Sequence, residues 1–548
     1  MNTKVTFFIA MVIACMCANA QVPKVTAKWE TSFNKNLQEN GLYDRYLGED
    51  ETSYYFLVKR KLSKWTAGYG IEKYDKTTLK PTESKTFEQE MKIAKVYRIG
   101  NEAYAYIYDN TSIYGSPDKK TTYEFYKFNK AEMVFEKMTQ QFSDYKFEKL
   151  EGIYLSPNQS KLLFVFREAA KKKDTDDNYQ LLMLDNQFQK IWEKKVTTKT
   201  LADITTDNAG NIYAAYRNYS DKKDYNYILV KWFANGNEKR FTVNMNDYLY
   251  HDCHPIASAD NNLLVLGYFS HKTDKNKTGG YFFAMNDDFS KAENLSFQDI
   301  PLDILTLNDK KKLQERYDEY EFGTPLYGEN GDIVICSEEN TVHARTSTST
   351  SGWVNHSQGA PGYAGYRPGA TTYSSVSAGT SGSMTTTSTT SRHYYYDIYV
   401  FKISGNKLSY MKRVPKNQSA SETGKIEGIP QIGDKLSYGI FLSGDNAVLI
   451  FVDNKKNMNT NETSKNIEGI FGSFIFSPLY KDGVLVSVIL DKDGKQTKQI
   501  VDISPLKKDN LEPEIMNCVH ISNNQAVFTA RGSKSVTDCK VGIISVGE

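Results

Sequence analysis

The residue types that could bind a metal gather in one short stretch, YHDCHP. It holds four possible zinc ligands, His251, Asp252, Cys253 and His254. In an extended strand, alternate side chains point to opposite faces, so the first and third of these groups face away from the second and fourth. One ion could not use all four without His271 or a ligand from elsewhere in the chain. We therefore expect a strand edge here, and we predict neither a metal site nor a cofactor.

Two acidic stretches resemble the beginning of a calcium-binding loop, DTDDN at 174–178 and DKDG at 491–494. The first has Tyr179 where such a loop needs glycine, and the second has Lys495 where an oxygen ligand belongs. Both stretches are typical of hairpin turns.

Acid–base chemistry on saccharides would need two carboxylates held about 5 to 9 Å apart. The chain has 66 acidic residues, but no spacing in the sequence pairs two of them, and no G-x-S-x-G motif marks a nucleophile. The sequence therefore predicts no catalytic residue. Two classes of function stay open, a binding or scaffolding protein, which we favour, and an enzyme that acts on saccharides.

Composition and charge narrow the class of protein. The formal net charge is only +2, which gives no reason to expect a nucleic acid as partner. The 38 tyrosines and 28 phenylalanines, in a chain of low mean hydropathy, are typical of many half-exposed strands. The composition therefore favours an all-β protein.

The first 20 residues have the pattern of a secretory signal, with Lys4, an apolar run and the small residues of ANAQ, so the mature chain would begin at Gln21. The apolar run is too short to span a bilayer, which needs about 20 residues. We expect export to the periplasm, the outer membrane or the medium. The stretch VIAC leaves a second possibility, because lipidation of Cys15 would attach the chain peripherally to a membrane.

Four cysteines follow this signal, Cys253, Cys336, Cys518 and Cys539. If residues 518–522, 525–531 and 538–546 are successive antiparallel strands, the last two cysteines lie two strands apart. That separation is about 9.6 Å, beyond the reach of a disulfide. We expect buried free thiols.

One shape returns along the chain: a turn rich in Asn, Asp and Gly followed by an apolar run of about six residues. It appears eight times, at 48, 98, 155, 205, 257, 326, 442 and 521. Each copy is typical of a β-hairpin, and most are followed by a second hairpin, as at 179, 225, 280 and 394. Two hairpins at a base period of about 50 residues are the mark of a β-propeller blade.

The run KLLFVF at 161–166 is apolar on both faces, which blades stacked around an axis would cover. We therefore predict one closed β-propeller of about eight four-stranded blades over residues 21–548. Seven blades is the near alternative, and a pair of β-sandwiches also fits strands at this spacing.

The copy LSPNQSKLLFVF, residues 155–166, resembles the Ser-Pro-Asp-Gly turn and strand of the WD40-like repeats in secreted bacterial propellers, the TolB-like group among them. The chain departs from that pattern, because Asn158 and Gln159 replace the Asp-Gly pair and the other copies keep only the turn chemistry. The resemblance implies a fold and no particular activity.

The last repeat offers only three strands, one fewer than a blade needs. Residues Val25–Thr31, VTAKWET, alternate apolar and polar side chains ahead of the first blade. We predict that they supply the missing strand, because an unpaired edge would leave the ring open.

Residues 341–393 form a low-complexity insertion in the sixth repeat, rich in Ser, Thr, Gly and Tyr and without Asp, Glu or Lys. Such a composition predicts a mobile loop, and loops pinned to a rigid sheet often carry recognition. The candidate ligand-binding residues are its aromatics, Trp353, Tyr363, Tyr366 and Tyr373. The partner they would contact is a protein, a peptide or a glycan.

A short amphipathic helix is expected at 307–322, packed as an ornament between two blades, with a partner-binding helix as the alternative.

Overall fold

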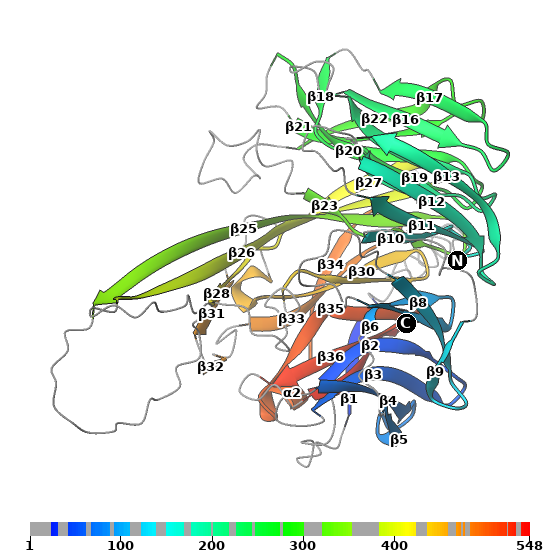
Figure 1. Ribbon diagram of the computed structural model, residues 1–548. Coiled ribbons are helices and arrows are strands. Elements are labelled where there is room, and N and C mark those ends of the chain that lie inside the picture. Colours follow the sequence, from blue (N-terminus) through cyan, green and yellow to red (C-terminus); the bar gives the residue numbers. More distant parts are fainter. Residues whose placement is uncertain are drawn as a thin grey trace, which may run out of the picture.

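The computed structural model describes most of the chain as strands (Figure 1). It describes the following residues: 23–30, 42–61, 67–87, 93–109, 122–138, 149–168, 177–198, 201–218, 226–243, 247–273, 278–300, 320–352, 383–423, 436–458, 467–472, 475–476, 483–522, 524–532 and 539–547. In this part of the chain, the only helical elements are η4 (Lys455–Asn457) and α2 (Ser504–Lys508).

The strands form eight sheets, the blades of one β-propeller, and their pairings are antiparallel except for one in blade 6. Blade 1 has β2 (Leu42–Glu49), β3 (Ser53–Lys61), β4 (Ala67–Asp75) and β5 (Pro81–Thr86), and blade 2 has β6 (Ile93–Ile99), β7 (Glu102–Asp109), β8 (Thr122–Asn129) and β9 (Val134–Lys137). Blade 3 has β10 (Lys149–Leu155), β11 (Lys161–Glu168), β12 (Asp177–Asp185) and β13 (Lys190–Thr198). Blade 4 has β14 (Leu201–Thr206), β15 (Ile212–Asn218), β16 (Asn226–Trp232) and β17 (Glu238–Val243). Eight blades were predicted, and eight are found.

In blades 5 and 6 the inner strand is split in two. Blade 5 has β18 (Tyr248–Tyr250), β19 (His254–Ala257), β20 (Leu263–His271), β21 (Thr278–Met285) and β22 (Ala292–Ile300). Blade 6 has β23 (Tyr320–Phe322), β24 (Leu326–Tyr327), β25 (Ile333–Gly352), β26 (Ser383–Ser404) and β27 (Lys407–Val414), with β28 (Gln418–Thr423), β31 (Ile467–Gly472) and β32 (Ile475–Phe476) added along β26.

Blades 7 and 8 complete the ring. Blade 7 has β29 (Gly439–Ser443), β30 (Asn446–Asn454), β33 (Gly483–Leu490) and β34 (Gln496–Val501). Blade 8 has β35 (Leu511–Ser522), β36 (Gln525–Gly532), β37 (Cys539–Gly547) and β1 (Lys24–Trp29).

The second strand of a blade is buried on both faces, as β11 illustrates. Leu162, Phe164 and Phe166 pack in one cluster with residues of blade 2, whereas Leu163 and Val165 pack in another with residues of blade 4. The outer strand β13 alternates exposed and half-buried residues. The doubly apolar run in the sequence therefore reflects burial between two neighbouring blades.

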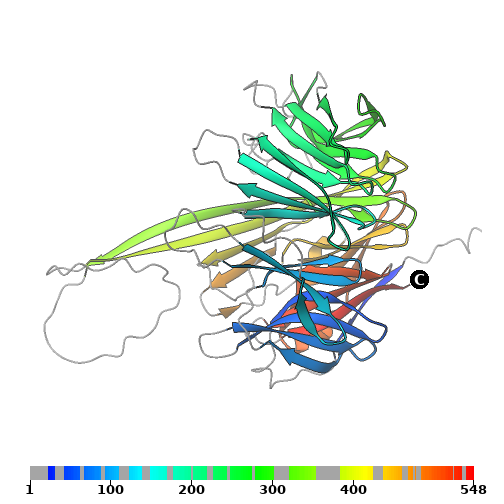
Figure 2. The ribbon, with the colours of Figure 1, turned by 45° about the vertical axis from the view of Figure 1, so that its right-hand side comes forward.

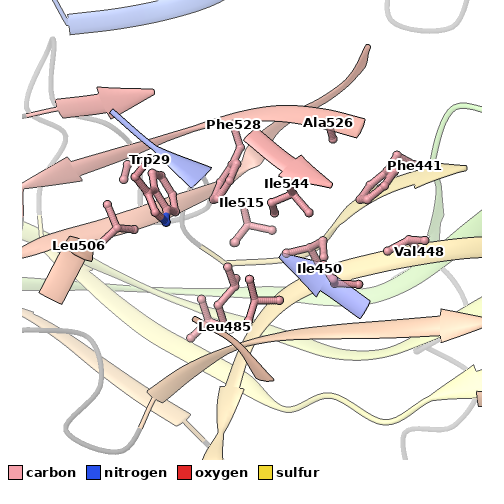
Figure 3. Packing of buried hydrophobic residues seen from close by; sticks show 14 of the residues in the cluster. Trp29, Phe441, Val448, Ile450, Leu485, Leu506, Ile515, Ala526, Phe528 and Ile544 are labelled. Atoms are coloured by element: carbon pink, nitrogen blue, oxygen red, sulfur yellow. The ribbon is translucent and has the colours of Figure 1, made fainter. Parts of the chain in front are cut away.

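The ring closes through its N-terminal strand, as predicted. β1 pairs with β37 from Lys24 opposite Gly547 to Trp29 opposite Gly542, and it forms the outer strand of blade 8. Figure 3 shows Trp29 among the residues that join blades 7 and 8, and its ring centroid lies 4.4 Å from that of Phe528. A Cβ atom at Gly542 would lie 2.5 Å from the Trp29 ring, so this position needs glycine.

Antiparallel pairing divides the propeller into two ends. At the turn end, short turns join the first strand of each blade to the second and the third to the fourth. At the ribbon end, the second strand ends and the third begins, and there β25 and β26 continue outward from the body (Figures 1 and 2). The turns of the eight repeats that the sequence predicted lie at the turn end, whereas the stretch 174–178 follows β11 and runs into β12, at the ribbon end.

The turn end is joined from blade to blade by an amide belt, which we define as Asn101, Gln159, Asn208, Asn261, Asn330 and Asn524. Asn208 is typical: its Oδ1 accepts the N–H of Asn158 at 2.9 Å, and its Nδ2 donates to the carbonyl of Ala259 at 2.8 Å. The other members make comparable bonds to a neighbouring blade. Gln159 has a φ of 58°, so it adopts the left-handed conformation that glycine has in the related turns at Gly210 and Gly331.

Candidate functional site

The ribbon of blade 6 corrects the prediction of a loop that begins near residue 341. Strands β25 and β26 stay paired from Ile333 opposite Ile403 to Gly352 opposite Ser383, so both flanks of the insertion are strands. Threonine favours extended backbone, and a two-stranded ribbon satisfies main-chain groups without burying apolar surface. The prediction of a loop, which was based on composition, is therefore wrong for the two flanks of the insertion.

The predicted binding residues Trp353, Tyr363, Tyr366 and Tyr373 lie outside the described residues, so their role stays a prediction. Most of the helix expected at 307–322 also lies outside the described residues. The prediction is wrong for its last three residues, because Tyr320 to Phe322 form the strand β23. Tyr320 is buried against Tyr399 of β26, and the pairing of β23 with β25 holds it there.

The ribbon leaves the body through a buried charged cluster, which we call the root cluster. It consists of Glu338, Asp397, Arg413, Lys416, Gln418 and Ser437. Lys416 Nζ forms an ion pair with Glu338 Oε1 and donates to Gln418 Oε1 at 3.1 Å. Ser437 Oγ donates to the second oxygen of Glu338. These contacts join β25, β28 and the start of blade 7.

Two further ion pairs flank this centre. Arg413 Nε lies 2.6 Å from Asp397 Oδ2, while Asp397 Oδ1 accepts the backbone N–H of Lys416. In blade 7, Asp453 accepts from Lys498 Nζ at 2.7 Å and from Asn457 Nδ2 at 2.7 Å. Gln418 Nε2 donates to the carbonyl of Val452 and so ties β28 to β30.

Burial controls the electrostatics of the root cluster. It raises the pKa of Glu338 and that of Asp397, and it lowers the pKa of Lys416, while the attraction between the opposite charges acts against these shifts. The Lys416 side chain has no exposed surface. These groups cannot meet a substrate directly, so their chemistry is that of an anchor that fixes where the ribbon leaves the body.

A second constellation lies on the inner strands of blades 4, 5 and 6. Asp203 Oδ2 of β14 pairs with His254 Nδ1 of β19, and the His254 ring stacks on Phe322 of β23 with centroids 5.0 Å apart and planes within 7°. The His254 side chain is 17% exposed, and its Nε2 makes no hydrogen bond. Burial alone would lower the pKa of His254, but the carboxylates of Asp203 and Asp252 outweigh it, so the pKa is raised.

This arrangement holds the His254 imidazole at Nδ1, while Nε2 is buried and makes no hydrogen bond among the described residues. Sequence reasoning missed it because Asp203 and His254 belong to different repeats. The positions within the repeats could have indicated this contact. Asp203 and His254 each stand four residues before the first residue of their turns, Asp207 and Ser258, and equivalent positions of neighbouring blades lie side by side.

His251 and Cys253 make contacts of their own, but residues 251–253 lie between β18 and β19, so the single extended strand that was expected here is not found. His251 Nε2 lies 2.9 Å from Ser270 Oγ, and burial lowers the pKa of His251 to about 4. Cys253 is fully buried beside Tyr281, and burial raises the pKa of its thiol. In the part of the chain that the structure describes, no group of three or more His, Cys, Asp and Glu side chains is placed to hold a metal ion.

The cysteine prediction is confirmed. All four cysteines are free; three of them are buried, whereas Cys518 is half-buried, and β36 separates Cys518 on β35 from Cys539 on β37. The stretch 491–494 is a turn, as expected: Asp491 Oδ1 accepts the N–H groups of Asp493 and Lys495, and Gly494 has a φ of 76°. Of the stretch 174–178, only the last two residues are described, and they begin β12.

Carboxyl groups with a raised pKa occur, but among the described residues they lie inside the blades or between them. Burial raises the pKa of Glu30 to about 8, and the nearby carboxylate of Glu72 adds to this effect. Glu30, Glu338 and Asp397 are 6%, 5% and 4% exposed. They therefore do not form the open pair of carboxylates that saccharide chemistry would need.

Comparison with known proteins gives only distant structural similarity. No protein-family model and no curated protein matches the chain. Similar solved structures include the polysaccharide lyase Uly1, with 11% identity over 92% of this chain and 90% of that one and a TM-score of 0.37. They also include the periplasmic gluconolactonase PpgL of Pseudomonas aeruginosa, with 12% identity over 79% and 92% of the two chains and a TM-score of 0.31. The Dos1 propeller has 11% identity over 54% and 65%, with a TM-score of 0.28.

Among the residues that the structure describes, no helix is long and apolar enough to cross a bilayer.

Proposed function

We propose that this chain is an exported, non-catalytic binding or scaffolding propeller of the bacterial cell envelope, which holds a protein, peptide or glycan partner at its ribbon end. The root cluster carries the proposal. Placing a lysine without exposed surface and two buried carboxylates under a projecting ribbon costs desolvation that apolar residues would avoid. A fixed direction of the ribbon is the property that such a network supplies.

The turn end, in contrast, has short turns tied to one another, with little chain to adapt to a partner. Binding residues are commonly carried by longer segments on a rigid scaffold. The ribbon end combines such segments with an anchored support, so we place recognition there.

The test removes the ribbon while keeping its root. Residues 345–391 are deleted and Ala344 is joined to Arg392 through Asn-Gly, which leaves a three-residue hairpin loop between the paired His343 and Arg392. Full-length and shortened chains then serve as bait for envelope extracts, with a glycan array beside them. We expect the melting temperature to stay nearly unchanged and the partner to be lost or bound at least about tenfold more weakly, which corresponds to ~1.4 kcal/mol.

A matched variant separates the aromatics from the ribbon. It keeps the full length and replaces Trp353, Tyr363, Tyr366 and Tyr373 by serine. If this variant loses the partner as well, the aromatics make the contact, as the sequence predicts. If the shortened chain binds as tightly as the full-length chain, the binding site lies elsewhere and the proposal is wrong.

The inner-strand constellation gives a second candidate function, an enzyme acting on saccharides. The observation in its favour is the orientation of His254 by Asp203, with Nε2 unpaired among the described residues although that atom is buried. A panel of neutral and acidic oligosaccharides should then be cleaved by the wild type, while His254→Gln loses at least about a hundredfold in rate, the lower bound for a general acid or base. Phe283→Leu, a buried change in the same blade, is the control for packing. Equal rates in wild type and His254→Gln would exclude this role.

A further inference from the structure

The edge of β25 beyond the propeller body is long and has no partner among the described strands. At its root, β23 pairs with Ser337 to Glu339. From Thr341 to Gly352, the described pairing of β25 is with β26 alone, so its other edge presents backbone N–H and C=O groups over roughly 37 Å, at about 3.4 Å per residue. Such a row is a template for another strand.

The outer strands of the propeller body carry residues that discourage pairing with another strand, and the outer part of the ribbon edge does not. The outer strands β1, β5, β9, β13, β17, β22, β27 and β34 each carry at least one Lys, Arg, Asp or Glu, and β5 also begins with Pro81. Charged residues and proline discourage pairing between edges. Residues 346–352, TSTSTSG, have neither. Protection is therefore absent along the edge that projects farthest from the body (Figure 2).

The ribbon already accepts added strands on its other edge. β28 pairs with β26 from Tyr395 to Thr390, and β31 of the following segment pairs in parallel with β28. Pairing by main-chain hydrogen bonds is thus how this sheet grows within one molecule. β28 ends at Thr423 opposite Thr390, which leaves β25 with the longer free edge.

We propose that the β25 edge from Thr341 to Gly352 pairs antiparallel with the same edge of a second copy of this chain. The outer half of the edge is self-complementary, because residues 346–351 consist of Thr and Ser alone, and cross-strand pairs between such residues are favourable. Arg345 is the single permanent charge in 341–352, so two copies meet little repulsion. Because the ribbon projects from the body, the two propellers lie at opposite ends of the joint sheet (Figure 1). This pairing is independent of the partner proposed above.

The test uses charge reversal in the full chain. One variant carries Thr346→Lys, Thr348→Lys and Thr350→Lys, which share a face of the strand, and a second carries Glu at the same positions. A two-fold axis perpendicular to the sheet sets like charges against each other in each variant. In sedimentation velocity we expect concentration-dependent dimers of the wild type, monomers of each variant, and dimers again when the two variants are mixed.

The control carries Thr385→Lys, Thr387→Lys and Thr389→Lys on β26, opposite the same three positions but one strand away from the seam. It should dimerise far better than the β25 lysine variant. In the wild type, amide exchange at 341–352 should slow as concentration rises.

Three results would overturn the proposal: a wild type that stays monomeric at all concentrations, lysine and glutamate variants that fail to combine, or a β26 control that is as monomeric as the β25 variant. The mixture also guards against misfolding, because unfolded variants would not restore the dimer.

Discussion

The two ends of this propeller are held together by different chemistry. At the turn end, neutral amides of the belt bridge one blade to the next, whereas ion pairs such as that of Lys402 with Asp332 lie within one blade. Toward the ribbon end lie buried charges, the root cluster in blades 6 and 7 and Glu514 with Arg531 in blade 8. Amides cost little to desolvate and tie down short turns, whereas buried charges fix a longer element but penalise any loss of a partner.

Both ends of the propeller depend on ring closure, so removing β1 should lower the free energy of unfolding more than any other change. Deleting residues 21–32 exposes the edge of β37 and removes Trp29 from the contact between blades 7 and 8. We expect a loss of more than ~4 kcal/mol, since truncating one buried tryptophan already costs ~3–5 kcal/mol. Urea unfolding measures it, with Trp29→Ala as the smaller step. A deletion mutant with an unchanged midpoint would show that the ring closes in another way.

The root cluster should be the most sensitive point of the ribbon end. Lys416→Met leaves Glu338 buried without its counter-charge, and breaking such a pair costs ~3–5 kcal/mol. The double variant Lys416→Met/Glu338→Leu removes both charges and should recover most of that loss. If the double variant is as unstable as the single one, packing rather than charge accounts for the effect.

The ribbon end should also respond to pH through Glu30. Its pKa is about 8 in the folded protein and 4.5 when unfolded, so the folded state holds one more proton between these values. Stability is therefore highest below pH 4.5 and falls as the pH rises toward 8, by at most ~1.4 kcal/mol per pH unit. Glu30→Gln should flatten this slope in melts recorded from pH 5 to 8. An identical slope in both proteins would contradict the assignment.

The amide belt should show the smallest effect. Asn208→Ala removes the bonds to Asn158 and Ala259 in neighbouring blades, and we expect a loss of ~1 kcal/mol. Asn235→Ala is the matched control, because its side chain bonds only Asn237 within its own turn. Equal losses in the two variants would mean that the belt adds nothing between blades.

The sequence predicted the parts of the molecule that are encoded locally. Each hairpin can be recognised by its turn residues and its apolar run. Eight blades and a closing strand near Val25–Thr31 could therefore be predicted without a structure. The flanks of the insertion could not, since Ser and Thr suit a loop and a strand equally until a partner strand is present. The pairs Asp203 with His254 and Glu338 with Lys416 could not be predicted either, because each joins residues that are far apart in the sequence and belong to different strands or loops.

The closing strand also has a consequence for the time at which the protein can fold. Thr26 of β1 bonds Ser545 of β37, 519 residues later in the chain. Contacts between such distant residues form slowly, because the intervening chain must be ordered before they are made. A ribosome delivers the chain from the N-terminus at about 5–20 residues per second, so β1 waits at least tens of seconds for its partner. During that interval the first blades are an open arc with two free edges, and a chaperone that covers β1 would decide when the ring can form.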